Sequence, residues 1–267
     1  MTEMITSSAN PRIKRIRKLS DRKERTKEGI FLAEGLRIVI EAIQLEKEIE
    51  TLIVAPELLR SQTGSENLNE FQSEHPERVM EVSADVFRSL SGKEGPQGIA
   101  ALIRPVWIEL DQVQPVGKDC WVALDKIADP GNLGTILRTA DASGVKGVIL
   151  LDQCTDPYDP RSLRGSMGAI FSLGIVKTSF EQFQVWVKQR GISVIGSSDK
   201  ADQDYHTLEY PSPLVLMMGS ERQGLDDLHI NLCNQVVRIP MTGRSDSLNL
   251  AVATGILLYE IYNQHRM

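Results

Sequence analysis

The chain of 267 residues is 41% hydrophobic and 25% charged, as expected of a globular protein, and it has no run of about 18 apolar residues that would predict a membrane span. Its net charge of −6 excludes a protein that is basic throughout, so nucleic acid would have to meet a local basic surface. The first residues carry no apolar stretch after their charges, and we therefore expect no secretory signal.

The length predicts two domains, because single domains average roughly 150 residues. Residues 105–119 contain Pro105 and Pro115 without sustained periodicity, which indicates a linker. We therefore expect a first domain at residues 1–104, which begins with a basic arm at residues 1–30, and a second domain at residues 120–267.

A basic segment lies near the start of the chain, at residues 12–27. Its nine lysines and arginines are opposed only by Asp21 and Glu24: Arg12, Lys14, Arg15, Arg17, Lys18, Arg22, Lys23, Arg25 and Lys27. Two interpretations are open, a solvated helix or a contact with the RNA backbone. For the second interpretation we take Arg12, Lys14, Arg15 and Arg17 as the candidates.

The rest of the first domain alternates helices with strands. A helix is expected at residues 34–48, where Leu36, Val39, Ile40 and Ile43 are at helical spacing. Short apolar runs predict strands at residues 51–55, 79–82 and 98–103. Ser83 should cap a brief helix that ends at Leu90, and the polar residues 61–76 predict a loop with a weak helix. This alternation predicts a small α/β domain built on one sheet.

The second domain shows the same alternation with longer buried runs. Strands are expected at residues 121–124, 147–151, 192–196, 214–218 and 236–239. Asn132 and Gly134 are expected in a turn before a helix at residues 133–142, and Ser247 is expected to cap a long helix at residues 248–259. The βαβ order predicts a mainly parallel sheet covered by helices.

Two of these strands deliver the chain to loops that should bind a ligand. The runs at residues 214–218 and 236–239 end abruptly in Gly, Ser or Pro, and ligands of open α/β sheets bind beyond such strand ends. The turn after the first strand of the domain reads KIADPGNLG, which lacks the GxGxxG fingerprint. A nicotinamide-dependent oxidoreductase is therefore disfavoured.

Three segments carry a resemblance to a known family. They are DPGNLGTILRTADASGV at residues 129–145, MGSERQGL at residues 218–225 and IPMTGRSDSLNLAVATGILLYE at residues 239–260. In order and spacing they resemble the three signature motifs of the SpoU (TrmH) family of RNA ribose 2′-O-methyltransferases. Upstream, FLAEGLRIVIEAI and GPQGIAAL resemble, less specifically, the substrate-binding domain of that family, which is similar to ribosomal proteins that bind RNA turns.

The resemblance implies a fold, a cofactor and an assembly. It implies that the second domain is a SPOUT trefoil-knot domain that binds S-adenosylmethionine and forms a homodimer. Cofactor contacts are implied at Gly219, Ile239 and Leu248, largely through backbone groups. Ser197, Thr242 and Gly243 are further candidates, and each is equally well explained as a turn residue.

The resemblance also implies catalytic residues. It places Arg138 beside the reacting ribose oxygen, with Asn132, Glu221, Ser247 and Asn249 as the other polar positions of the motifs. A guanidinium, with a pKa above about 12, is a poor base, so we expect Arg138 to stabilise the alkoxide and grip a phosphate, with the proton acceptor open. Arg161, Arg164 and Ser166 are implied to contact RNA. Each of these residues also has a purely structural interpretation. Arg138 could form a surface ion pair, Asn132 could be a turn residue, Ser247 could be a helix cap, and Arg161, Arg164 and Ser166 could belong to an ordinary helix start.

The resemblance implies a cytoplasmic, S-adenosylmethionine-dependent RNA 2′-O-methyltransferase, and we expect its target to be ribosomal RNA. A transfer RNA methyltransferase and a non-catalytic RNA-binding factor with the same fold are the alternatives. Three widely spaced cysteines fit a reducing cytoplasm: Cys120, Cys154 and Cys233. Four scattered histidines lack ligand spacing, so no metal is expected: His75, His206, His229 and His265.

Overall fold

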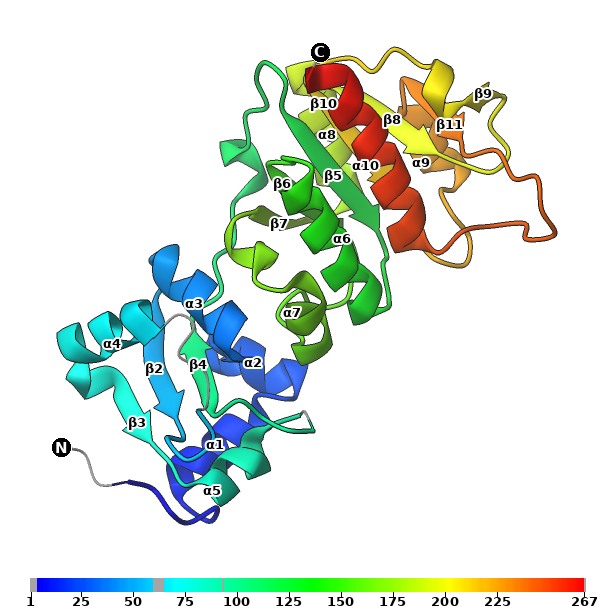
Figure 1. Ribbon diagram of the computed structural model, residues 1–267. Helices are drawn as coiled ribbons and strands as arrows, with labels where there is room; N and C mark the ends of the chain where they lie inside the picture. Colours follow the sequence, from blue (N-terminus) through cyan, green and yellow to red (C-terminus); the bar gives the residue numbers. More distant parts are fainter. Residues whose placement is uncertain (1–3, 60–64, 93, 267) are drawn as a thin grey trace. The chain divides into compact units, whose positions relative to one another are not determined.

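The computed structural model describes residues 4–59, 65–92 and 94–266. The chain divides into two compact units. Unit 1 comprises Met1–Pro105 and Tyr158–Phe171, and unit 2 comprises Val106–Pro157 and Ser172–Met267. Each unit combines helices with one sheet (Figure 1), and none of the described helices is long and apolar enough to cross a bilayer.

Unit 1 contains a four-stranded sheet in the order β1-β4-β2-β3. Its strands are β1 (Phe31–Glu34), β2 (Ile49–Val54), β3 (Val79–Glu81) and β4 (Ile99–Ile103). β4 pairs antiparallel with β1 and with β2, whereas β2 and β3 are parallel. The three strands predicted in this region are confirmed. β1 was missed, because its four residues are too few to show a pattern.

Helices surround this sheet. They are α1 (Pro11–Lys18), α2 (Arg22–Glu28), α3 (Leu36–Gln44), α4 (Ser65–Glu74), α5 (Ala84–Leu90) and α7 (Pro160–Ser166), with single turns η1 (Pro76–Arg78) and η3 (Ala169–Phe171). The predicted cap of α5 is confirmed, since the Ser83 hydroxyl accepts from the backbone N–H of Val86 at 3.4 Å. The start of the predicted loop, at residues 61–64, and residues 1–3 of the basic arm lie outside the described residues.

The segment Tyr158–Phe171 packs in unit 1 although it stands far away in the sequence. The ring of Phe31 lies 4.6 Å from that of Tyr158 and 6.4 Å from that of Phe171 between centroids. Stacked aromatic rings bury a large apolar area. No shift in composition marks this segment. Its place in unit 1 could not be predicted from a local pattern, because β1, against which it packs, is far away in the sequence.

Unit 2 contains a seven-stranded sheet in the order β7-β6-β5-β10-β8-β11-β9. Its strands are β5 (Cys120–Asp125), β6 (Gly147–Leu151), β7 (Gly174–Thr178), β8 (Ser193–Ser197), β9 (Gln203–Asp204), β10 (Leu214–Met218) and β11 (Gln235–Arg238). Every neighbouring pair is parallel. The predicted mainly parallel sheet is confirmed.

Helices cover both faces of this sheet (Figure 1). They are α6 (Pro130–Ala142), α8 (Phe180–Arg190), α9 (Asp227–Leu232) and α10 (Leu250–Arg266), with single turns η2 (Leu110–Gln112) and η4 (Tyr205–Thr207). Side chains alternate along a strand, and Trp121 and Ala123 of β5 share a core with Phe183 and Trp186 of α8. The opposite face is covered by α6 and α10, which pack side by side.

The start of α6 corrects one prediction. Asn132 and Gly134 lie within the first turns of this helix and not in a turn before it. The Asp129 side chain caps the helix by accepting from the backbone N–H of Asn132 at 3.0 Å, and Pro130 occupies the first helical position, which suits its fixed φ. The sequence DPGN therefore starts a helix, and the side chain of Asn132 projects from its first turn.

The start of α10 corrects a second prediction. Its cap is Asn249, whose Oδ1 accepts from the backbone N–H groups of Ala251 at 2.9 Å and Val252 at 3.3 Å. Ser247 does not cap the helix; its hydroxyl bonds instead to the carboxylate of Asp246 at 3.3 Å. Asn and Ser are comparable caps, so the residue type could not decide between the two positions.

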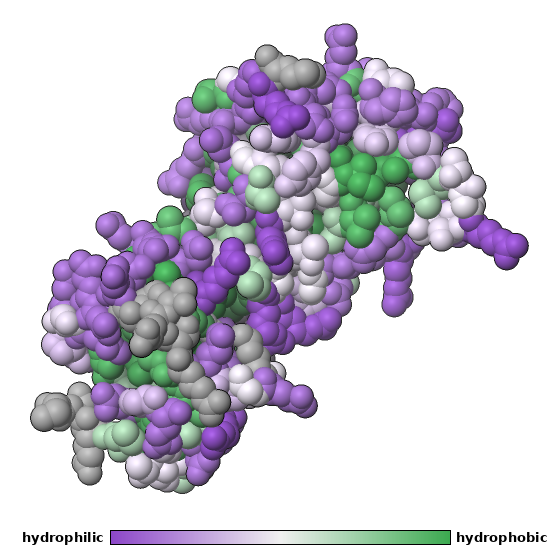
Figure 2. All heavy atoms as spheres, viewed as in Figure 1, coloured by the Kyte–Doolittle hydropathy of each residue, from purple (hydrophilic) through white to green (hydrophobic). Residues whose placement is uncertain are grey.

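The outward face of α10 is partly apolar. Val252, Tyr259 and Tyr262 are 52%, 45% and 39% exposed, and their spacing places them on one side of the helix. Figure 2 shows hydrophobic surface over the first turns of α10. Solvated helices normally carry polar residues on this side, so this face is suited to contact with another protein surface.

Candidate functional site

A cavity of about 480 Å³ opens at the carboxyl ends of β8, β10 and β11. The loops after these strands line it with Ser197, Ser198, Asp199, Lys200, Gly219, Ser220, Glu221, Arg222, Gln223, Gly224, Leu225, Ile239, Met241, Asp246, Ser247 and Leu248. α9 adds Asp227 and Ile230, and α10 adds Leu250 and Ala253. Ligands of parallel sheets bind at this edge, so the cavity is the candidate binding site of unit 2.

The loop after β10 folds back on itself at the cavity wall. The backbone N–H of Ser220 donates to the carbonyl of Gly224 at 3.2 Å, and that of Gly224 donates to the carbonyl of Ser220 at 3.0 Å. A Cβ on Gly219 would lie 2.0 Å from the carbonyl carbon of Gly224. The close approach that requires glycine at 219 is therefore made by the chain's own turn.

Most of the predicted cofactor contacts surround this cavity. Ser197, Gly219, Ile239 and Leu248 all line it. Thr242 and Gly243 belong to the loop between β11 and α10 and are exposed, but they are not among the lining residues. Two lining residues that were not predicted are Lys200, in the loop after β8, and Asp227, at the start of α9.

A network of three side chains joins the three motifs, and we call it the Glu221 network. The carboxylate of Glu221 accepts from the backbone N–H groups of Ala128 at 3.1 Å and Asp129 at 3.1 Å, and from Nδ2 of Asn132 at 3.3 Å. Nδ2 of Asn249 donates to Oδ1 of Asn132 at 3.0 Å. Residues far apart in the sequence thus hold the start of α6, the start of α10 and the β10 loop together.

The Glu221 network favours an ionised carboxylate. Burial raises the pKa of Glu221, but hydrogen bonds from the backbone N–H groups of Asp129 and Ala128 lower it by more, so the pKa lies below its ordinary value of 4.5. These N–H groups stand at the amino end of α6, where the helix dipole also favours negative charge. Glu221 therefore acts here as a charged clasp on the start of α6.

The lining of the cavity suits a ligand that carries a positive charge and polar edges. Four carboxylates line it, those of Asp199, Glu221, Asp227 and Asp246, against the two cationic side chains of Lys200 and Arg222. Apolar side chains and backbone edges complete the wall, as in most small-molecule sites. Within the described ranges, no group of three or more His, Cys, Asp or Glu residues could hold a metal ion.

Arg138 lies apart from this cavity within its own chain. It is exposed on α6 and is not among the residues that line the cavity. No hydrogen bond or ion pair to another described residue holds its guanidinium. Of the five predicted catalytic residues, Asn132, Glu221 and Asn249 are therefore brought together, Ser247 joins them at the cavity wall, and Arg138 does not.

The basic segment of unit 1 divides into structural and solvent-facing side chains. Arg15 pairs with Glu28 at 2.8 Å and with Glu50 at 3.2 Å, and Arg17 donates to the carbonyl and hydroxyl of Ser89. Arg25 is 5% exposed, and its guanidinium donates to two carbonyls at the end of α1. Arg12 and Lys14 are exposed.

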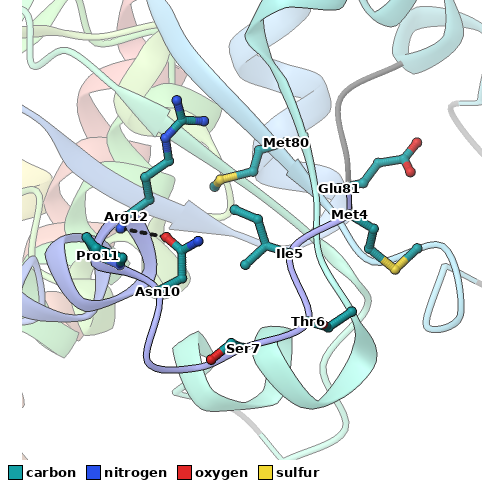
Figure 3. A pocket seen from close by; sticks show the side chains of 9 residues that line it. All are labelled: Met4, Ile5, Thr6, Ser7, Asn10, Pro11, Arg12, Met80 and Glu81. Atoms are coloured by element: carbon teal, nitrogen blue, oxygen red, sulfur yellow. Dashed lines mark hydrogen bonds between the residues drawn. The ribbon is translucent and has the colours of Figure 1, made fainter.

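Arg12 stands at the edge of a hollow of about 550 Å³ in unit 1. Figure 3 shows Met80 and Ile5 on its wall and Asn10 beside Arg12. The Asn10 side chain accepts from the backbone N–H of Arg12 at 2.9 Å and so caps α1. The side chain of Arg12 is therefore presented by a fixed helix start.

The predicted RNA contacts of α7 are unequally placed. Arg161 is exposed and Arg164 is half-buried. Ser166 is fully buried, and its hydroxyl donates to the carbonyl of Leu163 at 2.9 Å. The structure therefore gives no support to an RNA contact through Ser166, whose small polar side chain satisfies the helix backbone instead.

Two family models match the chain. The SpoU rRNA Methylase family matches residues 119–259, which include the whole Glu221 network. The MRM3-like substrate binding domain matches residues 10–101, which include the basic segment. The two matches thus fall on the two halves of the chain that carry these features.

Relatives match the chain along nearly all of its length. The 23S rRNA (uridine(2479)-2'-O)-methyltransferase of Streptomyces viridochromogenes is 33% identical over 92% of this chain and 87% of its own. The 23S rRNA (guanosine(2553)-2'-O)-methyltransferase RlmP of Bacillus subtilis strain 168 is 29% identical over 97% of this chain and 99% of its own. The crystal structure of an AdoMet-bound rRNA methyltransferase from Sinorhizobium meliloti superposes with a TM-score of 0.90 at 36% identity, covering 98% of this chain and 97% of that chain.

Proposed function

Because the chain belongs to the SpoU rRNA methylase family, we propose that it transfers a methyl group from S-adenosylmethionine to a ribose 2′-hydroxyl of ribosomal RNA. The observation that carries this proposal is the Glu221 network, which joins the three family motifs beside a cavity at the ligand-binding edge of the sheet. The relatives named for this reaction act on 23S rRNA, which favours ribosomal over transfer RNA.

The cavity would hold the cofactor. Its lining is acidic on balance, which suits a sulfonium cation, and the backbone at Gly219, Ile239 and Leu248 supplies polar edges for the rest of the ligand. Bound S-adenosylmethionine supplies an electrophilic methyl group. The trefoil knot implied by the sequence resemblance would run through the same loops, and we propose it for unit 2.

Arg138 would act across a homodimer. Its guanidinium is exposed and stands outside the lining of its own cavity, on a helix that packs beside α10. The apolar face of α10, with Val252, Tyr259 and Tyr262, is a surface that a second copy would cover. In that assembly Arg138 would serve the cavity of the other copy, where it would stabilise negative charge on the ribose oxygen and hold the adjoining phosphate.

The chain's own residues would then prepare the reaction by positioning. Glu221 and Asn249 fix the starts of α6 and α10 around the cavity, and fixed geometry supplies much of the rate in a displacement of this kind. A guanidinium rarely gives up its proton, so the hydroxyl proton leaves to another acceptor, such as water or a phosphate oxygen.

RNA would meet unit 1 through its solvent-facing cations. Arg12 is exposed beside the hollow shown in Figure 3, Lys14 is exposed on α1, and Arg161 is exposed on α7. Exposed cationic side chains can neutralise phosphates. In the part of the chain that the structure describes, Cys120, Cys154 and Cys233 form no disulfide, in keeping with a reducing compartment, and we propose a cytoplasmic location.

The test combines substrate choice with a signature of ribose methylation. Purified protein is incubated with methyl-labelled S-adenosylmethionine and, separately, with 23S rRNA, 16S rRNA and transfer RNA from a strain that lacks the enzyme. A 2′-O-methyl group removes the hydroxyl that attacks the neighbouring phosphate in alkali. We therefore expect label in 23S rRNA that survives alkaline hydrolysis as a dinucleotide.

Other outcomes separate the alternatives. Label in transfer RNA alone would contradict the ribosomal target. Label that alkali releases in mononucleotides would contradict ribose chemistry. Binding of cofactor and RNA without any transfer would indicate a non-catalytic RNA-binding factor.

A further inference from the structure

A buried histidine stands between two carboxylates directly behind the cavity. His229 is 2% exposed and Asp125 is 4% exposed. Nδ1 of His229 lies 2.6 Å from Oδ1 of Asp226, and Nε2 lies 3.4 Å from Oδ1 of Asp125. Neither Nε2 nor this Asp125 oxygen has a hydrogen-bond partner among the described residues, so each depends on the other.

The geometry requires a doubly protonated ring. A carboxylate only accepts, so Nδ1 must donate to Asp226. In a neutral ring Nε2 would then carry a lone pair that faces the buried Asp125 oxygen, and two acceptors would oppose each other away from water. A proton on Nε2 removes this conflict. The ring of Phe180, 4.0 Å away between centroids, covers the imidazole on one side.

The histidine joins two parts of the active site. Asp125 ends β5, and the chain continues from it to Ala128 and Asp129, which Glu221 clasps. Asp226 directly follows the β10 loop and caps α9, and α9 lines the cavity through Asp227 and Ile230. The tie through His229 therefore links the clasped segment to one wall of the cavity.

We propose that the imidazolium of His229 is a positioning residue that fixes α9, and with it one wall of the cofactor cavity, against the end of β5. The proposal rests on the proposed function in that the cavity takes S-adenosylmethionine. It assigns His229 no contact with the ligand or with RNA. Its role is to hold Asp227, Ile230 and the end of the β10 loop in the places where the ligand meets them.

The charges around His229 set the direction of its pH dependence. Asp125 faces His229 from the end of β5 and pairs with Lys126, whose Nζ lies 3.7 Å from Oδ2 of Asp125. Asp226 faces it from the cap of α9. The Cys233 thiol donates to the His229 carbonyl, and α8 presents the uncharged ring of Phe180. Burial lowers the pKa of His229, but the two facing carboxylates of Asp125 and Asp226 raise it by more, to above its ordinary value of 6.5. The contact of charged His229 with Asp125 and Asp226 is therefore fully formed below pH 6.5, and it is lost as the pH rises through the raised pKa of His229.

Nuclear magnetic resonance tests the charged state without any ligand. The ring nitrogens of His229 are followed in ¹⁵N-labelled protein from about pH 6 to about pH 9, with assignment by the His229→Gln variant. We expect both ring nitrogens to show imidazolium shifts at neutral pH and to titrate above the ordinary histidine pKa of 6.5. A neutral ring at neutral pH would overturn the proposal.

Calorimetry with S-adenosylmethionine tests the positioning role. In the wild-type protein we expect the Kd to rise about five- to tenfold over the same pH range, as for a modest coupling between sites. The Asp125→Asn variant should bind with a flat pH profile, because its amide can donate to Nε2 of a neutral imidazole. The His229→Gln variant should bind weakly at every pH, while the control His206→Gln should keep the wild-type profile.

Titration of the ligand itself affects the wild-type protein and the three variants equally. Only the differences between their pH profiles of Kd are therefore interpreted. Identical pH profiles in wild-type and Asp125→Asn proteins would overturn the positioning role. If the wild-type protein binds no S-adenosylmethionine at any pH, both the proposed function and the positioning role of His229 are overturned. The magnetic resonance titration would still decide by itself whether His229 is charged.

Discussion

At the cavity edge of unit 2 the polar side chains hold one another, whereas in the basic segment of unit 1 they divide between holding the fold and facing solvent. Glu221, Asn132 and Asn249 form one connected network. Arg15 and Arg25, by contrast, are engaged within the fold, and Arg12 is free to meet a partner. Spacing between motifs therefore identifies function more safely than a run of like charges does.

The largest effect should come from Arg138, whose guanidinium is exposed on α6 and lies outside the Glu221 network. Arg138→Ala is expected to lower kcat by about 100- to 1000-fold, the usual loss when one donor to a developing oxyanion is removed. Because the side chain is exposed, the free energy of unfolding should change by less than about 0.5 kcal/mol. Single-turnover methyl transfer and thermal unfolding measure the two quantities. A variant with normal turnover would remove Arg138 from the reaction.

Arg138→Ala also tests the homodimer. If each cavity uses the Arg138 of the other copy, mixing this variant with a Gly219→Ala variant, whose added Cβ would clash with the carbonyl carbon of Gly224 at the wall of its own cavity, should restore activity at one of the two sites of the mixed dimer. The expected recovery is about one quarter of the wild-type rate at equal mixing and free exchange, by random pairing of copies. No recovery in exchanged dimers would place Arg138 at the site of its own chain.

Loss of the clasp should have the next largest effect. Glu221→Ala leaves the N–H groups of Ala128 and Asp129 without their acceptor, and we expect methyl transfer to fall about 100-fold through misplacement of the start of α6. The exposed Glu209 offers a matched control, since Glu209→Ala removes a charge without a network. Equal activities of the two variants would show that the network does not position the site.

The clasp also predicts an acid limit. The pKa of Glu221 is lowered in the folded protein, so its contribution to stability is complete above 4.5 and is lost as the pH falls through the lowered pKa. Thermal unfolding of wild-type protein and of Glu221→Gln should therefore differ near neutral pH and converge in acid. Curves that stay parallel down to the lowest pH would contradict this role.

A smaller effect should separate the two kinds of basic side chain. The double variant Arg12→Ala with Lys14→Ala should bind RNA about tenfold more weakly and reduce the slope of log K against log salt by about 2. Arg15→Ala should leave that slope unchanged and lower stability by less than about 1 kcal/mol, because its exposed ion pairs contribute little. Equal slopes of log K against log salt in the two variants would show that Arg15 and the solvent-facing pair of Arg12 and Lys14 do not differ in their contact with RNA.

The smallest effect concerns the cap of α10. Asn249→Ala should lower the free energy of unfolding by about 1 kcal/mol, the usual value of a helix cap. Ser247→Ala should change it by only a few tenths of that value, because the only hydrogen bond of the Ser247 hydroxyl to a described residue is with Asp246. Chemical denaturation measures both variants. The opposite order would restore Ser247 as the cap.

Local patterns were enough to predict the buried strands and the edge at which the site lies. β6 and β10 follow their apolar runs residue for residue, because both faces of a central parallel strand are buried. The motif spacing also brought Asn132, Glu221 and Asn249 to the same edge. The strands could be predicted because each apolar run is local. The edge of the site could be predicted because the carboxyl ends of parallel strands lie at the same edge of a sheet.

What the sequence could not predict depends on partners far along the chain. His229 looked like one of four scattered histidines, because Asp125 is distant in sequence and only Asp226 is a neighbour. Arg25 looked like any other cation of the basic segment until the fold buried it. The burial of Tyr158 against Phe31 is set by tertiary packing in the same way.

The amides of the Glu221 network can be oriented in only one way. Glu221 only accepts, so Asn132 must turn its NH₂ group to it and its oxygen to Asn249, which must then donate while its own oxygen caps α10. The substitution Asn249→Asp would keep an oxygen for the cap but replace the donor with a second oxygen. The amide of Asn132 could not flip to compensate, so this variant would lose the link to Asn132 while the cap of α10 remained.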